Sequence, residues 1–304
     1  MTSSPQFYRW KDLRCAYTVH GESNSNQKPA LVLIHPIGVG LSGFFWQRFI
    51  EAWLALHDEY VIYNPDLLGC GASDMPTVAY YSIDWANQIK FLIENVVKKP
   101  VILIVQGASF PIAIELLQVI SNPDLIKGLV LSTPPAWSTM TKKAKPLQNK
   151  LLWNLLFNSP IGLGQLFYNY ARRRQFIKSF SARQLFANAE EVDANWLDSL
   201  ITEAKNTRTR YAVFSFLAGF WRKDYTEEIS EIKQPTLVVW GKKTSSISKE
   251  SKGETVEERS NLYLKHLSQG EVEIIEGRNV LPYESTSKFV RVVSDFLRSS
   301  SNVD

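Results

Sequence analysis

Ser109 is the residue whose type and surroundings most directly suggest chemistry. It lies in Gly107-Ala108-Ser109-Phe110-Pro111, which approximates the pattern G-x-S-x-G and follows a run of apolar residues. In that pattern a serine nucleophile stands on a strained turn between a strand and a helix. Pro111 replaces the last glycine, and proline is tolerated in the first turn of a helix. The segment therefore predicts a serine nucleophile, with the alternative that Ser109 only caps its helix.

Two further motifs follow apolar runs earlier in the chain. His35-Pro36-Ile37-Gly38-Val39-Gly40 resembles an oxyanion loop, and residues 66–74 spell D-L-x-G-x-G-x-S-D. In this order and spacing, the three motifs resemble those of the α/β-hydrolase superfamily over nearly the whole chain except a central helical stretch. The chain also looks like a group of such proteins from photosynthetic bacteria. Asp66 and Asp74 are expected to form the turn by bonding nearby backbone N–H groups.

The resemblance implies a catalytic triad in the chain order serine, acid, histidine. The acid is expected after the next-to-last strand, where Thr244 stands, and the alternative acid position offers only Ser132 and Thr133. The histidine is expected after the last strand, where Val280 stands. A serine hydroxyl needs a base to accept its proton and an acid to orient that base. We therefore predict that ordinary serine hydrolysis is absent.

Histidine is scarce, which limits the choice of another base. Only His35 is expected to approach Ser109, and the other three histidines are His20, His57 and His266. His35 is therefore a candidate base, with the competing interpretation that its ring hydrogen-bonds loop backbone. The resemblance also implies that the backbone N–H groups of Ile37 and Phe110 are oxyanion donors.

Alternating strands and helices are predicted to position these residues. Continuous apolar runs indicate strands buried on both faces. Strands are expected at 30–35, 60–63, 101–105, 128–131, 236–240 and 271–275, with an antiparallel edge hairpin at 7–10 and 15–19. Amphipathic helices are expected at 44–56, 84–97, from about 109, at 256–267 and at 285–297. This order predicts an α/β-hydrolase fold with a mostly parallel, doubly wound sheet.

The alternation stops in the middle of the chain. Residues 134–223 are rich in Leu, Phe, Trp and Tyr and contain no convincing strand, so they are expected to form a helical cap inserted in a core of residues 1–133 and 224–304. Residues 125–189 contain no Asp or Glu but ten basic residues, whereas the whole chain carries only +4. The basic residues are Lys127, Lys142, Lys143, Lys145, Lys150, Arg172, Arg173, Arg174, Lys178 and Arg183.

This charge has two interpretations. The basic side chains form either a solvated rim around a lid, or a lid that lies on an anionic membrane, where each basic residue contributes about 1 kcal/mol near the headgroups. Arg172, Arg173, Arg174 and Lys178 are the expected contacts. A nucleic-acid partner is not expected, because no recognition motif accompanies the charge.

Length and composition set the remaining bounds. With 304 residues and 45% apolar residues, the chain can bury one large core or a core plus a lid. The N-terminus shows no signal peptide, no run is apolar enough to span a bilayer, and two cysteines suit a reducing interior. We therefore expect a cytoplasmic location, with peripheral attachment to the inner face of a membrane.

Three functions remain open from the sequence. The first is binding of a hydrophobic small molecule near a membrane, or chemistry other than ordinary serine hydrolysis. The second is an ester hydrolase that uses Ser109 with an unconventional base such as His35 or water. The third is a protein-interaction scaffold. No metal site or cofactor is expected, because His, Cys and carboxylate residues do not cluster along the chain.

Overall fold

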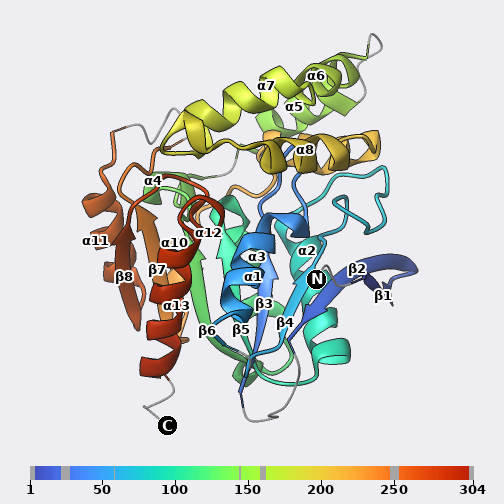
Figure 1. Ribbon diagram of the computed structural model, residues 1–304. Helices are drawn as coiled ribbons and strands as arrows, with labels where there is room; N and C mark the ends of the chain where they lie inside the picture. Colours follow the sequence, from blue (N-terminus) through green and yellow to red (C-terminus); the bar gives the residue numbers. More distant parts are fainter. Residues whose placement is uncertain are drawn as a thin grey trace.

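An eight-stranded sheet crosses the middle of the computed structural model, which describes residues 4–21, 28–57, 59–143, 145–157, 162–246 and 253–300 (Figure 1). The strand order is β1-β2-β4-β3-β5-β6-β7-β8. The strands are β1 (Gln6–Trp10), β2 (Leu13–His20), β3 (Ala30–Ile34), β4 (Ile62–Pro65), β5 (Val101–Gln106), β6 (Ile126–Ser132), β7 (Thr236–Gly241) and β8 (Gly270–Ile275).

The sheet is mostly parallel. The hairpin of β1 and β2 is antiparallel, and β2 pairs antiparallel with β4. All later pairs, from β4–β3 to β7–β8, are parallel. The carboxyl ends of six strands therefore meet at one edge of the sheet, which is where loops carry ligands in open α/β sheets.

Helices cover both faces of this sheet because alternate strand residues point to opposite sides. Leu31 and Leu33 of β3 belong to the buried cluster that includes α1 (Gln47–Leu54) and α13 (Thr286–Ser300). Val32 belongs to the cluster on the other face. That face carries α2 (Ser82–Phe91), α3 (Phe110–Val119) and α11 (Val256–His266), and the short α10 (Thr226–Ser230) and α12 (Leu281–Glu284) precede β7 and α13.

Further helices lie between β6 and β7 along the chain, and most of them lie beyond the carboxyl edge of the sheet (Figure 1). They are α4 (Trp137–Met140), α5 (Pro146–Phe157), α6 (Leu163–Ala171), α7 (Arg174–Phe180), α8 (Ala194–Glu203) and α9 (Arg210–Leu217). Of the predicted insertion, Ala144 and residues 158–161 lie outside the described residues. No helix in the described ranges is long and apolar enough to cross a membrane.

The predicted fold class is confirmed by this architecture. Each expected strand is present within a few residues of its predicted bounds, and the predicted hairpin forms one edge of the sheet. The helix expected at 84–97 ends in a π-helical segment, Leu92–Val97, and Lys98 then takes a left-handed conformation that ends it.

Candidate functional site

The loops that were expected to carry chemistry do converge at the carboxyl edge of the sheet. The loop after β8 is tied to the ends of β5 and β6 through the backbone carbonyl of Asn279. Gln106 Nε2 donates to this carbonyl at 2.7 Å, and Thr133 Oγ1 donates to it at 3.1 Å. Gln106 Nε2 also lies 3.1 Å from Thr133 Oγ1. These hydrogen bonds hold the ends of β5 and β6 and the loop after β8 in one fixed arrangement.

The strained residue of the turn after β5 is Gly107. Gly107 has φ +57°, a conformation that glycine adopts without the steric penalty of a Cβ. Ser109 has φ −85° and ψ −2°, which is ordinary helical geometry, and its side chain is fully buried. The expectation of a strained serine is thus corrected: the positive φ falls two residues earlier. A Cβ on Gly107 would have room, since the nearest atom, Thr133 O, would lie 4.0 Å away.

Ser109 is hydrogen-bonded to the backbone of His35. Its Oγ donates to His35 O at 2.8 Å. The His35 ring is engaged elsewhere: Nδ1 donates to Pro36 O at 2.9 Å, and Nε2 accepts the N–H of Leu67 at 3.0 Å. Burial lowers the pKa of His35, and the nearby charge of Asp66 only partly opposes that effect. Because Nε2 accepts an N–H, it carries no proton, and both hydrogen bonds of the ring are to loop backbone, as in the competing interpretation.

The loop that follows β3 is packed tightly against the inserted helices. A Cβ on Gly40 would lie 2.0 Å from Leu200 O of α8, so α8 sits directly on this loop. Ile37 is buried. The N–H of Phe110 donates to Gly107 O as the helix begins. Of the two expected oxyanion donors, the N–H of Phe110 is therefore already hydrogen-bonded within the turn.

At the expected acid position, the hydroxyl of Thr244 hydrogen-bonds to two backbone groups. Its Oγ1 accepts the N–H of Gly241 at 2.9 Å and donates to Arg278 O at 2.7 Å. The hydroxyl thus joins the end of β7 to the loop after β8. Asp in its place would lack the hydroxyl hydrogen that binds Arg278 O.

Val280 lies at the expected histidine position and is 4% exposed. It belongs to the same buried cluster as Phe186, Trp196 and Tyr283. The Trp196 ring is 4.7 Å from that of Tyr283 and 5.2 Å from that of Phe186, measured between centroids. Phe186 and Trp196 come from the segment between β6 and β7, so aromatic side chains of that segment share a buried cluster with Val280.

Polar contacts hold these helices against the core. Asp193, just before α8, pairs with Arg48 of α1 and accepts the hydroxyl of Tyr283 at 3.1 Å. Glu284 Oε2 accepts the N–H of Ala187 at 2.8 Å. Burial raises the pKa of Glu284, although three backbone N–H groups oppose this rise. The segment over the carboxyl edge is therefore fixed by directional bonds as well as by apolar packing.

The acidic turn after β4 has the structural role that was expected. Asp66 Oδ1 accepts the N–H of Gly43 at 2.8 Å, and its Oδ2 accepts the N–H of Ala72 at 2.8 Å. Asp74 Oδ2 accepts the N–H of Arg14 at 2.7 Å. Both carboxylates therefore order the turn and its neighbours.

The other three histidines contact residues other than Ser109. His20 Nε2 lies 2.8 Å from Thr18 Oγ1, and His57 Nδ1 lies 3.7 Å from Glu59. The His266 ring stacks on Trp137 at 4.4 Å between centroids. In the described residues no group of His, Cys, Asp and Glu could hold a metal ion.

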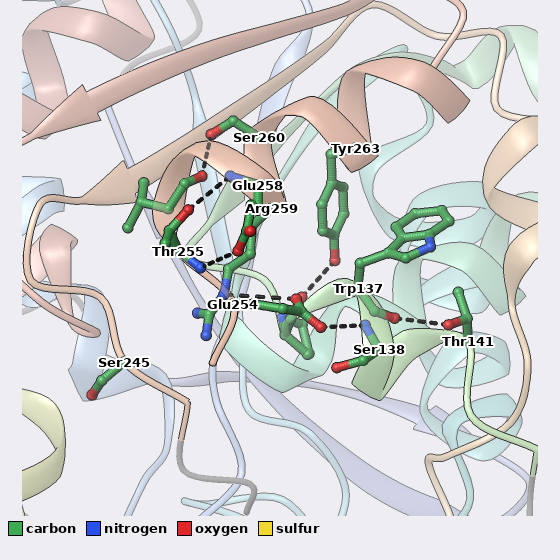
Figure 2. Close-up of polar contacts among 12 residues, drawn as sticks. Trp137, Ser138, Thr141, Ser245, Glu254, Thr255, Glu258, Arg259, Ser260 and Tyr263 are labelled. Atoms are coloured by element: carbon green, nitrogen blue, oxygen red, sulfur yellow. Dashed lines mark hydrogen bonds and ion pairs between the residues drawn. The ribbon is translucent and has the colours of Figure 1, made fainter. Parts of the chain in front are cut away.

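A second polar cluster lies beyond the end of β7, between α4 and α11 (Figure 2). Glu254 accepts the N–H of Ser138 at 3.1 Å and faces the guanidinium of Arg259 at 3.9 Å. The side chain of Arg259 is only 3% exposed. Tyr263 donates its hydroxyl to Pro135 O at 2.8 Å. These contacts fasten α11 to the segment that follows β6.

The expected membrane-contact residues lie on α7 and in the turn between α6 and α7. Arg174 pairs with Asp198 of α8, so part of its charge is neutralised within the protein. The Arg173 guanidinium lies 5.7 Å from the centre of the Tyr170 ring. Lys178 and Arg173 are exposed, and Arg172 is partly buried. Whether they contact a membrane stays a prediction.

Two surface hollows in the described residues lie away from the loops around Ser109. One, of about 350 Å³, is lined by residues of β8 and α13. The other, of about 240 Å³, lies between α3 and α10.

Four residues lie at this edge of the sheet: Gln106, Gly107, Thr133 and Asn279. Of these, Gln106, Gly107 and Asn279 were not predicted from the sequence as functional residues. A signal for Gly107 was present: a glycine directly after a buried strand marks the residue that needs a positive φ. No sequence pattern indicates that the carbonyl of Asn279 accepts two side-chain hydrogen bonds.

Comparison with known proteins places the chain in a family. A profile of the alpha/beta hydrolase family matches residues 31–292, so the chain belongs to this family. A proline iminopeptidase of Lactobacillus helveticus is 25% identical over 238 residues, covering 74% of this chain and 76% of its own.

Solved structures share the fold at lower identity. A serine hydrolase involved in carbazole degradation has a TM-score of 0.72 and 18% identity, with 98% of this chain and 99% of that chain covered. An enol-lactonase from Burkholderia xenovorans LB400 has a TM-score of 0.71 and 16% identity, with 96% and 100% covered.

Proposed function

We propose that this protein is a member of the alpha/beta hydrolase family that does not hydrolyse substrates with a serine nucleophile, and that acts by binding at the inner surface of a membrane. The observation that carries the first part is the turn after β5. We infer that Gly107 takes the nucleophile's place, because it follows the strand directly and has the positive φ of the strained elbow residue. Glycine offers no hydroxyl there.

The other two triad positions agree with this inference. Thr244 uses its hydroxyl between two backbone groups, and Val280 is buried among aromatic side chains. Neither side chain can accept a proton from a serine. Ser109 is fully buried and its hydroxyl is already bonded to His35 O, so a substrate carbonyl has no open approach to it.

The closed edge of the sheet supports the same proposal. An active site needs a space beside the nucleophile for the reacting group. Here α8 rests on Gly40, and Trp196 and Phe186 share a buried cluster with Val280. These contacts favour a rigid, packed interface between the inserted helices and the core.

An activity test separates this proposal from the ester-hydrolase alternative. Purified wild-type protein and a Ser109→Ala variant are incubated with a fluorophosphonate probe, p-nitrophenyl butyrate and a prolyl p-nitroanilide, the last because a relative is named a proline iminopeptidase. We expect no covalent labelling and equal background rates. Labelling of Ser109, or a turnover that Ser109→Ala abolishes, contradicts the proposal and supports a hydrolase in which His35 or water serves Ser109.

A hydrophobic small molecule is a second candidate ligand, favoured by one feature of the elbow. A Cβ added at Gly107 would lie 4.0 Å from its nearest neighbour, Thr133 O, and beside it the buried Gln106 Oε1 has no hydrogen-bond partner among the described residues. A slender apolar ligand with one donor group suits both. Thermal melting with long-chain alcohols and fatty acids tests this: we expect stabilisation in wild type that Gly107→Leu removes by filling the space. Equal stabilisation of both proteins contradicts this site.

A further inference from the structure

Helix α5 exposes leucines that a surface helix usually buries. Leu147, Leu151 and Leu155 are 79%, 69% and 52% exposed. Their spacing of four residues places them along one side of the helix. Of all the residues of α5, only Trp153 is buried. Contiguous exposed apolar surface on a protein marks a site of contact with a partner or a membrane.

The neighbouring helix extends the apolar surface. α6 exposes Leu166 and Tyr170, which are 62% and 53% exposed. The two helices pack closely, since a Cβ on Gly164 of α6 would lie 2.0 Å from Leu156 O of α5. Both lie at the end of the molecule beyond α8, away from the sheet (Figure 1). Their position leaves a broad outer surface free of the core.

The charge beside these leucines is positive. Lys145, just before α5, and Lys150, within it, are exposed. The nearest acids along the chain are Asp124 and Glu190, because residues 125–189 contain none. A second copy of this chain would bring like charge against like charge, which is unfavourable. An anionic lipid surface supplies both an apolar layer and negative headgroups.

We propose that the α5 face, defined as Lys145, Leu147, Lys150, Leu151 and Leu155, docks on an anionic membrane with the helix in the plane of the interface. The leucines enter the boundary between headgroups and acyl chains, and the lysines contact lipid phosphates. This inference rests on the membrane association proposed above and names its surface. It assigns the main membrane contact to α5 rather than to Arg174, whose charge is already paired with Asp198.

The leucines are tested by flotation with two kinds of vesicle. One holds equal parts of phosphatidylglycerol and phosphatidylcholine, and the other holds phosphatidylcholine alone. We expect wild type to bind the anionic vesicles, and Leu147→Gln/Leu151→Gln/Leu155→Gln to bind them at least about tenfold more weakly, because leucine burial drives insertion. Leu56→Gln is the matched control, since Leu56 is 69% exposed and lies just past the end of α1.

The lysines have their own matched control. Lys145→Gln/Lys150→Gln should weaken binding to anionic vesicles several-fold and reduce its dependence on salt, because screening acts on the lost charges. Lys127→Gln/Lys233→Gln removes two exposed charges next to the amino ends of β6 and β7 and should leave binding unchanged. Arg172→Gln/Arg173→Gln/Arg174→Gln should have a smaller effect than the α5 leucine variant.

A site-specific probe reports the contact directly. Leu151→Cys, labelled with an environment-sensitive dye, should shift to the blue on anionic vesicles, whereas labelled Leu56→Cys should not. The two native thiols should resist labelling: Cys15 and Cys70 are buried, and burial raises the pKa of Cys15 to about 12 and also raises that of Cys70.

Three binding results overturn the inference. They are failure of wild type to bind anionic vesicles, equal binding to both vesicle types, and binding that survives the triple leucine variant. A dimer that disperses only in the leucine variant also overturns it, because a second copy would then cover the face. None of these results depends on ester turnover, so failure here is distinguishable from failure of the non-hydrolytic proposal.

Discussion

Ser109 donates its hydroxyl to the backbone carbonyl of His35, while the ring of His35 binds the backbone of Pro36 and Leu67. The serine and the imidazole thus meet, but through the wrong atoms for proton transfer. Two loops that would hold a nucleophile and its oxyanion donors are instead joined by a structural hydrogen bond. This relationship makes the loop after β3 and the turn after β5 a single rigid unit.

Substitution of Gly107 tests where the backbone strain lies. Gly107→Ala should lower the free energy of unfolding by about 1 to 2 kcal/mol, because a Cβ is unfavourable in the left-handed conformation. Steric contact adds little, since the nearest atom would be 4.0 Å away. Gly107→Asn should lose less, because asparagine tolerates this conformation. Urea unfolding measures all three proteins, and equal losses for alanine and asparagine would argue against strain as the cause.

Because His35 is buried, we predict that the stability of the folded protein decreases at acid pH. Burial lowers its pKa from the ordinary value of 6.5, so the unfolded chain binds a proton there more readily than the folded protein. Stability is therefore fully present above the unfolded pKa and decreases as pH falls below it, until the folded pKa is passed. Urea unfolding between about pH 5 and 8 measures this slope. In His35→Gln the slope should be smaller, and an unchanged slope would assign the effect to other groups.

Restoring the two missing triad side chains should not restore catalysis. Thr244→Asp loses the hydroxyl bond to Arg278 O, and Val280→His inserts a larger ring among Phe186, Trp196 and Tyr283. We expect the double variant to be destabilised by about 1 to 3 kcal/mol from overpacking. It should show no Ser109-dependent ester hydrolysis. Strong activity with an unchanged melting temperature would mean that the site is still arranged for catalysis.

The buried pair of Glu254 and Arg259 should couple α11 to the segment after β6. Glu254→Gln should destabilise the protein by about 3 kcal/mol, because it removes the carboxylate that faces a buried guanidinium. Glu254→Gln/Arg259→Met should lose clearly less than the sum of its two single variants, since the uncompensated charge is gone. A double-mutant cycle by urea unfolding measures the difference, and simple additivity would show that the two groups do not interact.

The sequence by itself determined the fold class, and it predicted that a conventional triad is absent. Runs such as Ala30–Ile34 and Val101–Gln106 are apolar throughout because both faces of a central parallel strand are covered, and this pattern is local. The motifs around His35, Asp66 and Ser109 also predicted which loops meet at the carboxyl edge. The sequence also has Thr244 where the triad acid was expected and Val280 where the histidine was expected.

Only the tertiary structure decided what the remaining residues do. The G-x-S-x-G pattern fits Ser109, but the positive φ belongs to Gly107, because the turn begins where β5 stops pairing, and pairing is a property of neighbouring strands. The hydrogen bond from Ser109 to His35 spans 74 positions, so no local pattern contains it. The sequence predicted a helical cap rich in leucine, but it did not predict which of these leucines are exposed. Burial depends on what other helices bring to that surface, and here they leave it open.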